Sequence, residues 1–347
     1  MAKISVPAGA KELTAEWLFA TLKSKFPINL DQNIKLEQIG QDFGFASEIY
    51  RVSWVSHNQP HSLIVKLWDV SAAGMGEVHF YRHFKDCGAR IPQSFYGAIS
   101  ENGQRGVLIL EDLVNTKQGD VLKRLKGEQA YRVAKNLAKM HAAWSENPIL
   151  GELEWLSEKS IANRGSDWFL QRRQTFLKRF PNHLNGLPLL LLNNIERTPQ
   201  IVTERLKSAP HTLLHGDFHL DNILFKNKVE PIFLDWARPT KGPLVLNLAD
   251  LLFSMISLDE FDAVLDCYIS EYEQISKWPL DNLELMQQLG GALLQSFAIN
   301  TCGIALFEPT LPRAIQMIDD GIYHAVSVID FWHERDPQLF AFLFPKR

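Results

Sequence analysis

The hydrophobic periodicity of the chain changes near residue 113, and this change restricts the folds that the chain can adopt. Before it, apolar residues alternate with polar ones or form short leucine-rich and β-branched runs, which is typical of strands. These runs are residues 50–54, 62–68 and 106–113. After it, apolar residues recur every three or four positions, as in amphipathic helices. The clearest helical patterns are at residues 133–144 and 315–332. We therefore expect an α+β fold in which a small sheet-rich lobe, residues 1–112, precedes a larger, mainly helical lobe, residues 113–347.

Each lobe also contains elements of the other type. In the sheet-rich lobe, one helix follows Thr14, a residue suited to cap a helix N-terminus, and a second spans about residues 76–84. In the helical lobe, residues 212–225 and 229–236 are typical of two short strands joined by a polar turn. The helical lobe is therefore expected to carry a loop and a β-hairpin.

The composition excludes several classes of protein but indicates no activity. The chain has 347 residues, 46% hydrophobic and 22% charged, as in soluble globular proteins of one or two domains. Lysine and arginine (36) nearly balance aspartate and glutamate (40), so we expect no nucleic-acid surface. No signal-peptide core or membrane-spanning run stands out, which favours a cytoplasmic protein. The three cysteines are far apart, which indicates buried thiols and neither a disulfide frame nor a zinc site.

The sequence His215-Gly216-Asp217-Phe218-His219-Leu220-Asp221-Asn222 carries the most specific chemical information in the chain, together with Leu234-Asp235-Trp236. A loop followed by a hairpin can bring Asp217, Asn222 and Asp235 to one cleft. Phosphoryl transfer to a hydroxyl needs one carboxylate to orient the acceptor, and a carboxylate and an amide oxygen to hold Mg²⁺ against the phosphates. The alternative is a polar turn whose side chains only cap backbone groups. The four matching positions and the later aspartate favour the phosphotransfer interpretation.

These residues resemble the motifs of the aminoglycoside phosphotransferase and choline kinase superfamily. HGDxxxxN is similar to the kinase catalytic loop, and Leu-Asp-Trp occupies the place of the kinase DFG. The resemblance implies a protein-kinase-like, two-lobed fold with a small antiparallel sheet in the first lobe. It also implies that Asp217 is the catalytic base, that Asn222 and Asp235 are the magnesium ligands, and that His215 packs under the loop.

Lys66 lies in the middle of an apolar run, where a lysine is costly unless its ammonium finds a partner or reaches water. One interpretation is an edge-strand lysine that points to solvent. The kinase resemblance implies another, in which the lysine holds the α- and β-phosphates and pairs with a helix glutamate. Glu77 is the expected partner, although alone it could serve only the dipole of its helix.

Two further segments complete the expected nucleotide site. Gly40, Gly44 and Ser47 precede the strand ending at Trp54, and their backbone N–H groups are expected to contact phosphate, although any hairpin could carry two glycines. The main-chain groups of Glu111 and Leu113 are expected at the hinge between the lobes, against the adenine edge. The alternative for this segment is an interlobe connector with solvated acids.

The order of the motifs is closest to the ecdysteroid-kinase-like, or CHK kinase-like, branch, over roughly residues 11–255. One departure concerns the segment after Leu-Asp-Trp, where the family usually has an aspartate that braces the catalytic loop. Here either Asn247 replaces that acid or Asp250 supplies it one turn later. His211 and His219 are interpreted as ordinary polar neighbours. Among the tryptophans, Trp144, Trp168, Trp236 and Trp332 could line a pocket, but most are expected in the core or at its rim.

The predicted function is an ATP- and Mg²⁺-dependent phosphotransferase that acts on a hydroxyl of a small molecule. The acceptor stays open among amino alcohols, sugar-like antibiotics and hydrophobic alcohols, and the protein is expected to be a monomer or homodimer. The alternative is a nucleotide-binding regulatory protein of the pseudokinase type. The presence of all four expected polar residues argues against it; these are Lys66, Asp217, Asn222 and Asp235. A protein kinase is disfavoured because no APE-type activation segment follows Asp235.

Overall fold

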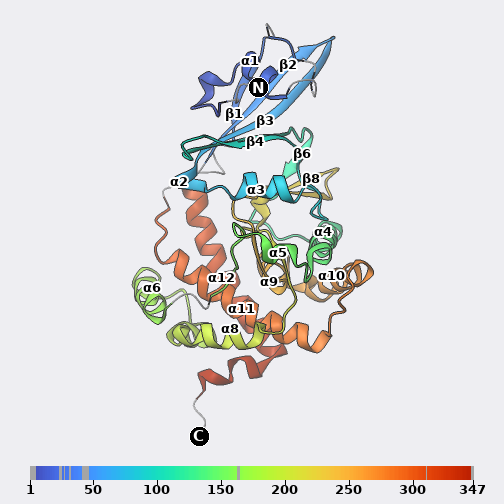
Figure 1. Cartoon of the computed structure of the whole chain (residues 1–347). Helices are drawn as coiled ribbons and strands as arrows, with labels where there is room; N and C mark the ends of the chain where they lie inside the picture. Colours follow the sequence, from blue (N-terminus) through green and yellow to red (C-terminus); the bar gives the residue numbers. More distant parts are fainter. Residues whose placement is uncertain are drawn as a thin grey trace.

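The computed structural model describes residues 5–22, 26, 28–30, 33–40, 47–161, 165–309 and 311–344. Antiparallel strands form one end of the molecule and helices form the other, with the two chain termini at opposite ends (Figure 1). The expected order of a sheet-rich lobe before a mainly helical lobe is therefore confirmed. We refer to these as the N-lobe and the C-lobe.

The N-lobe is built on a five-stranded antiparallel sheet with the order β1-β2-β3-β5-β4. Its strands are β1 (Lys35–Ile39), β2 (Ser47–Ser56), β3 (Gln59–Asp69), β4 (Ser94–Ile99) and β5 (Arg105–Glu111). The three runs of strand-like sequence correspond to β2, β3 and β5. Strand β3 is central, so Lys66 is opposite Ile49 on one side and Leu108 on the other. The edge-strand interpretation of Lys66 is therefore wrong.

The two faces of this sheet are covered by different helices. The N-lobe helices are η1 (Ala10–Glu12), α1 (Ala15–Leu22), α2 (Val70–Ala73) and α3 (Gly76–His83). Trp17 and Leu18 of α1 pack with Val52 and Val65 on the outer face. The expected cap of α1 is present, because the Trp17 N–H donates to Oγ1 of Thr14 (3.2 Å). Helix α3 lies against the other face, between the sheet and the C-lobe (Figure 1).

Helices form most of the C-lobe. The α-helices are α4 (Glu128–Trp144), α5 (Ile149–Glu152), α6 (Ser166–Arg179), α7 (Gly186–Asn193), α8 (Thr198–Leu206), α9 (Val245–Asp250), α10 (Phe261–Ile275), α11 (Asn282–Ile304) and α12 (Pro312–Arg335). Short 3₁₀ segments are η3 (Ile195–Arg197), η4 (Leu220–Asn222), η6 (Leu258–Glu260) and η7 (Pro337–Leu343), and η5 (Leu251–Met255) is a π-helical turn. The two helical patterns that the sequence shows most clearly correspond to α4 and α12. Helix α11 is buried on several sides and packs against α6, α8 and α9.

Two small sheets hold the segment between α8 and α9. Strands β6 (Thr116–Gln118), β8 (Ile223–Lys226) and β9 (Glu230–Phe233) form one, with β8 in the middle. Strands β7 (His211–Leu214) and β10 (Thr240–Pro243) form the other. The expected hairpin is β8–β9, and its turn residues Asn227 and Lys228 adopt left-handed conformations (φ 49° and 69°). The loop at residues 215–222 therefore starts at the end of β7 and leads into β8.

Within the described ranges, no helix has the length and apolar character needed to cross a membrane. The three cysteines are free thiols. Cys87 and Cys302 are buried as expected, whereas Cys267 is partly exposed. Trp236 and Trp332 are fully buried core residues.

Candidate active site

The sharp turn after β7 depends on Gly216. This residue has φ 83°, a left-handed conformation that a side chain disfavours. A Cβ atom built at this position would lie only 1.6 Å from the backbone oxygen of Arg238. The loop therefore packs directly on the segment that follows Trp236, which brings two distant parts of the motif together.

His215 connects the loop to the segment around Trp236. Its Nε2 hydrogen-bonds to the backbone oxygen of Leu234 (2.7 Å), and its ring packs on Trp236 with centroids 4.3 Å apart. Burial lowers the pKa of His215 to about 4, so the ring is neutral at pH 7 and its Nε2 donates this bond. The expected structural role of His215 is thus present as a direct link between residues 215 and 234.

Asn247, not Asp250, makes the direct contact that braces the loop. The His215 N–H donates to Oδ1 of Asn247 (2.8 Å), and Nδ2 of Asn247 donates to Oδ2 of Asp250 (3.1 Å). Asp250 is also near the ammonium of Lys159 (3.7 Å). Of the two alternatives open in the sequence, Asn247 therefore replaces the usual acid, and Asp250 orients the Asn247 amide.

Asp217, His219 and Asn222 lie together in this loop, with Asp217 exposed, His219 half-buried and Asn222 buried. Nδ2 of Asn222 donates to the backbone oxygen of Asp217 (2.9 Å) and lies 3.0 Å from Nε2 of His219. The same histidine nitrogen lies 3.7 Å from Oδ2 of Asp217. The adjacent His219 ring, together with nearby positive charge that includes Arg238, lowers the pKa of Asp217 to about 2. Asp217 is therefore a carboxylate at neutral pH, with about half of its side chain exposed.

Lys66 joins the N-lobe to this site through two carboxylates. Its Nζ lies 2.7 Å from Oε2 of Glu77 and 2.9 Å from Oδ1 of Asp235. Burial would lower the pKa of Lys66, but the two carboxylates outweigh it and raise the pKa above its ordinary value. The backbone N–H of Trp236 donates to Glu77, which ties α3 to the same segment. The expected Lys66–Glu77 ion pair is present, and both side chains are more than nine-tenths buried.

Asp235 and Asn222 carry a carboxylate oxygen and an amide oxygen, which suit Mg²⁺, a cation that prefers hard oxygen ligands. Asp235 uses Oδ1 for Lys66, and the Leu234 N–H donates to the Asn222 backbone oxygen (2.8 Å), so the two residues are held close together. The Asn222 amide uses its donor end within the loop, so its carbonyl oxygen is the end suited to a cation. Among the described residues, no group of three histidine, cysteine or carboxylate side chains could hold a metal. A magnesium ion here would therefore depend on phosphate oxygens as well.

The expected phosphate loop is described only at its ends. Gly40 has φ 72° just after β1, and Ser47 begins β2 opposite Trp68. Gly44 lies outside the described residues. Gly40 and Ser47 therefore flank the segment in which the sequence predicts phosphate contacts.

The expected hinge is an ordered connector. Both carboxylate oxygens of Glu111 accept from Nη2 of Arg90 (2.8 and 2.7 Å), and the Leu113 backbone oxygen accepts from the Thr116 hydroxyl (2.7 Å). Asp112 accepts two hydrogen bonds from the guanidinium of Arg51 and is almost fully buried. The solvated-connector alternative is therefore wrong for Asp112.

With the geometry established, comparison with known families is informative. The sequence model of the phosphotransferase enzyme family (APH) matches residues 44–282, well over half of the chain. The chain belongs to this family. The match confirms the superfamily to which the motifs point, and the closer relation to the ecdysteroid-kinase-like branch stays a prediction.

Solved structures confirm the fold of this phosphotransferase. Choline kinase from Cryptosporidium parvum Iowa II has a TM-score of 0.59 and 12% identity, covering 97% of this chain and 98% of its own. Spectinomycin phosphotransferase APH(9)-Ia, in complex with ADP and spectinomycin, has a TM-score of 0.55 and 15% identity, covering 95% and 100%. Choline kinase LicA from Streptococcus pneumoniae has a TM-score of 0.51 and 13% identity, covering 86% and 95%. No curated protein matches the sequence significantly. The expected kinase-like, two-lobed fold is confirmed.

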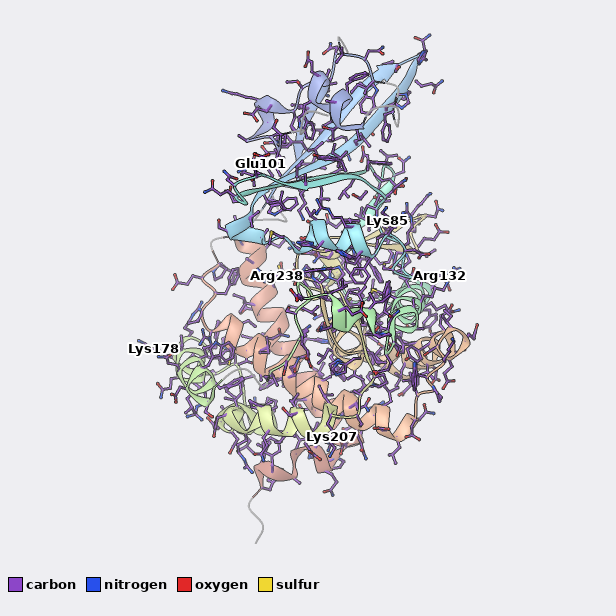
Figure 2. The ribbon with its side chains drawn as sticks, in the orientation of Figure 1. Lys85, Glu101, Arg132, Lys178, Lys207 and Arg238 are labelled. Atoms are coloured by element: carbon purple, nitrogen blue, oxygen red, sulfur yellow. The ribbon has the colours of Figure 1, made fainter. Side chains whose placement is uncertain are left out.

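Three polar residues near the site of this phosphotransferase were not predicted from the sequence. His219 is more than an ordinary neighbour, because it lies between Asp217 and Asn222. Arg238 lies centrally, below α3, whereas Lys85, Glu101, Arg132, Lys178 and Lys207 are spread over the periphery (Figure 2). Arg313 of α12 contacts the loop residue Asp221 through Nη2, 2.9 Å from both carboxylate oxygens. The second histidine of the motif was a visible signal for His219, but nothing in the sequence pairs Arg313 with Asp221.

Proposed function

We propose that this phosphotransferase transfers the γ-phosphoryl group of ATP, with Mg²⁺, to a hydroxyl group of a small molecule. One observation carries the proposal. A continuous set of contacts runs from Lys66 through Asp235 and the Leu234 backbone to Asn222 and Asp217. These are the residues that phosphoryl transfer requires to lie together.

Asp217 is the proposed catalytic base. Its pKa of about 2 keeps it charged, so it can accept a hydrogen bond from the acceptor hydroxyl and orient it toward the γ-phosphorus. The low pKa also means that Asp217 is a weak base in the free protein. Its main contribution is therefore positioning of the nucleophile, with proton transfer late in the reaction.

Lys66 and the two proposed metal ligands act on the other reactant. Glu77, which itself accepts a hydrogen bond from the Trp236 N–H, holds the Lys66 ammonium in place, so that the ammonium can bind the α- and β-phosphates. A magnesium ion held by Asn222 and Asp235 would neutralise the charge of the phosphate oxygens. In the proposed site, Gly40, Gly44 and Ser47 contact phosphate, and the main-chain groups of Glu111 and Leu113 bind the adenine edge.

The test uses Asp217→Asn, assayed by ADP release with an acceptor that the unmodified protein phosphorylates. We expect kcat to fall by about 10²–10⁴-fold while ATP binding, measured by calorimetry, is retained. The control is Asp266→Asn, because Asp266 is exposed on α10, away from these contacts. Wild-type turnover in Asp217→Asn would refute the assignment of the base. Slow ATP hydrolysis that no acceptor stimulates would favour the regulatory alternative.

A further inference from the structure

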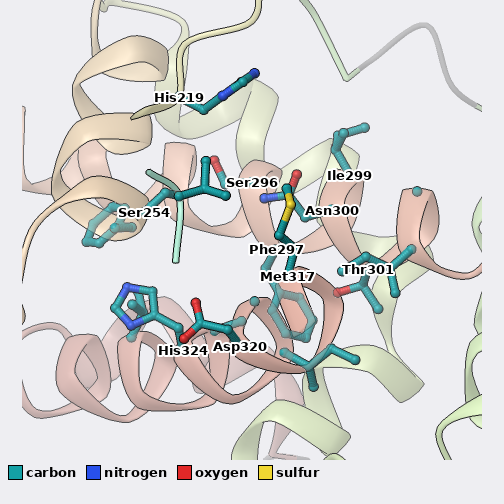
Figure 3. Close-up of a pocket in the computed structure, with 18 of the residues that line it drawn as sticks. His219, Ser254, Ser296, Phe297, Ile299, Asn300, Thr301, Met317, Asp320 and His324 are labelled. Atoms are coloured by element: carbon teal, nitrogen blue, oxygen red, sulfur yellow. The ribbon is translucent and has the colours of Figure 1, made fainter. Parts of the chain in front are cut away.

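A large pocket in the C-lobe opens beside the catalytic loop. It has a volume of about 620 Å³, within the range of pockets that bind small organic ligands. Helices α11 and α12 and the π-helical turn η5 form much of its wall. Figure 3 shows His219 at one end of the pocket, and His324 and Asp320 at the other.

The position of this pocket connects it to the proposed reaction. His219 and Leu220 belong to both the catalytic loop and the pocket wall. Nε2 of His219 is 3.7 Å from Oδ2 of Asp217, so a molecule that fills the pocket can bring a hydroxyl next to the proposed base. Phe253, Ser254 and Met255 of η5 also line the pocket, and π-helical turns are frequent at functional sites.

We propose that the phosphoryl acceptor is an uncharged alcohol with a mainly hydrocarbon body, bound in this pocket. This inference rests on the proposed function. The wall is dominated by large apolar side chains from several helices. They include Phe176, Leu184, Phe253, Met255, Leu293, Phe297, Ile304, Phe307, Met317 and Val328. A hydrocarbon body bound against such a wall is stabilised because its apolar surface is removed from water.

The charges in the pocket are compensated. Arg124 and Asp320 are the charged residues among the described residues that line it, and they pair with each other at 2.7 Å. Burial lowers the pKa of His324 to about 4, so its ring is neutral at pH 7. At the other end, His219 faces the Asp217 carboxylate. A charged acceptor would therefore lose its hydration without gaining an uncompensated opposite charge among the described lining residues.

The lining argues against the two cationic acceptor classes. A polycationic sugar needs several carboxylates, and Asp320 is the single carboxylate among the described lining residues. A quaternary ammonium group needs a cage of aromatic faces, for which tryptophan is the strongest residue. The described lining contains phenylalanine but neither tryptophan nor tyrosine. Ser254, Ser296, Asn300 and Thr301 supply uncharged polar groups that suit a few hydroxyl or carbonyl groups on the ligand.

The first experiment compares matched acceptors by Mg-ATP-dependent ADP release. Long-chain neutral alcohols, farnesol and oestradiol form one set, and choline, kanamycin and N-alkyl ethanolamines of the same chain length form the other. We expect kcat/KM for the best neutral alcohol to exceed that of its amine-bearing counterpart by at least about tenfold. Equal or better use of the cationic set would overturn the inference.

Two variants test whether the pocket is the site. Ser296→Phe adds a ring to the wall of the pocket and should raise the KM for the neutral acceptor about tenfold or more, with the affinity for ATP unchanged. Ser327→Phe makes the same change on the exposed side of α12, outside the pocket, and should leave the KM unchanged. A similar KM in both variants would place the acceptor elsewhere.

Removal of the compensating charge gives an independent test. Arg124→Gln leaves Asp320 unpaired and should shift the ratio of kcat/KM values toward N-alkyl ethanolamines by about tenfold, whereas Arg124→Lys keeps the pair and should not. An unchanged ratio in Arg124→Gln would contradict the role of charge compensation.

Calorimetric titration with Mg-ATP separates the two proposals. Binding of Mg-ATP together with a preference for cationic acceptors would refute only the acceptor class. Failure to bind Mg-ATP at all would instead refute the proposed function.

Discussion

Asp235 combines a chemical role with an unusual backbone conformation. Its φ of 56° lies in the left-handed region, which costs most residues with a side chain roughly 1–2 kcal/mol and which asparagine and aspartate tolerate better. The conformation turns the chain between β9 and Trp236, so that the carboxylate meets Lys66 while the indole enters the core. The residue type is thus constrained twice, by its backbone and by its charge.

These two constraints can be separated by substitution. Asp235→Asn keeps the backbone preference and removes the charge, so we expect Mg²⁺-dependent ATP binding to weaken at least about tenfold. Asp235→Ala removes both, and we expect it to be less stable than Asp235→Asn by about 1–2 kcal/mol. Calorimetry with and without Mg²⁺ measures the first effect, and urea unfolding measures the second. Unchanged Mg²⁺-dependent binding in both variants would remove Asp235 from the metal site.

Single residues were informative where the proposed chemistry requires an unusual residue type or an unusual spacing. A lysine inside an apolar run and an aspartate and asparagine at fixed spacing could be singled out from the sequence alone. The ion pair of Lys66 and Glu77 followed from them and is present. His219 was undervalued because its importance comes from the turn at Gly216. The second partner of Lys66, Asp235, lies 169 residues away in the chain, which no local pattern describes.

Helix α12 is positioned to influence the catalytic loop directly. Arg313, in its first turn, bridges Asp221 of the loop and Asp120 (3.2 Å), and the Val121 N–H also donates to Asp221 (3.0 Å). Further along the same helix, Met317 and Asp320 line the proposed acceptor pocket. The helix therefore touches the acceptor pocket and the residue next to Asn222.

We expect Arg313→Gln to lower kcat about tenfold, because Asp221 would lose two charged hydrogen bonds beside the proposed metal ligand. The free energy of unfolding should fall by about 1–3 kcal/mol. Arg132→Gln is the matched control, since Arg132 pairs with Glu128 on the exposed side of α4 and its loss should cost less than about 0.5 kcal/mol. Steady-state kinetics and urea unfolding check both. Equal kinetics in the two variants would show that the Arg313 contact is not functional.

Long periodic elements were predictable, and short polar ones were not. Helices α4 and α12 have clear apolar stripes, and β2, β3 and β5 are rich in β-branched or leucine residues. Strand β1 is mostly exposed, and β6 and β10 have only three or four residues each, too few to show a period. Helix α11 carries three glycines and is buried on several sides, so it shows no simple stripe.

Across the part of the chain that the structure describes, two histidines are fully buried and stay neutral. Burial lowers the pKa of His141 to about 3 and that of His215 to about 4. In the unfolded chain both rings take up a proton near pH 6.5, so the unfolded state binds more protons below that value. As the pH falls from about 6.5 toward 4, protonation of these histidines in the unfolded state therefore lowers the free energy of unfolding.

At pH 5 each of these histidines should reduce the free energy of unfolding by roughly 2 kcal/mol relative to pH 7. Urea unfolding at pH 7 and at pH 5 measures the combined decrease in the free energy of unfolding. His141→Gln should shrink the difference between the two pH values by roughly 2 kcal/mol, whatever its effect at pH 7. A difference that does not change in this variant would mean that His141 is not protonated on unfolding in this range.

The two-lobed fold was predictable because the change in hydrophobic periodicity near residue 113 and the order of the motifs indicate the same fold. The packing between the halves was not, because it depends on Phe80 of α3 and Trp236, whose stacked rings are 3.9 Å apart but more than 150 residues apart in the chain. A division after residue 112 therefore stays a prediction.

This stack has a consequence for modularity. One face of the N-lobe sheet and α3 share a continuous hydrophobic core with the C-lobe, through residues such as Trp68, Phe80 and Leu108. A fragment that ends at residue 112 would expose this face, so it should aggregate when produced alone. Recombination between relatives should succeed only when α3 and the segment around Trp236 come from the same parent. The N-lobe and the C-lobe surface on which it rests are thus expected to diverge as one unit.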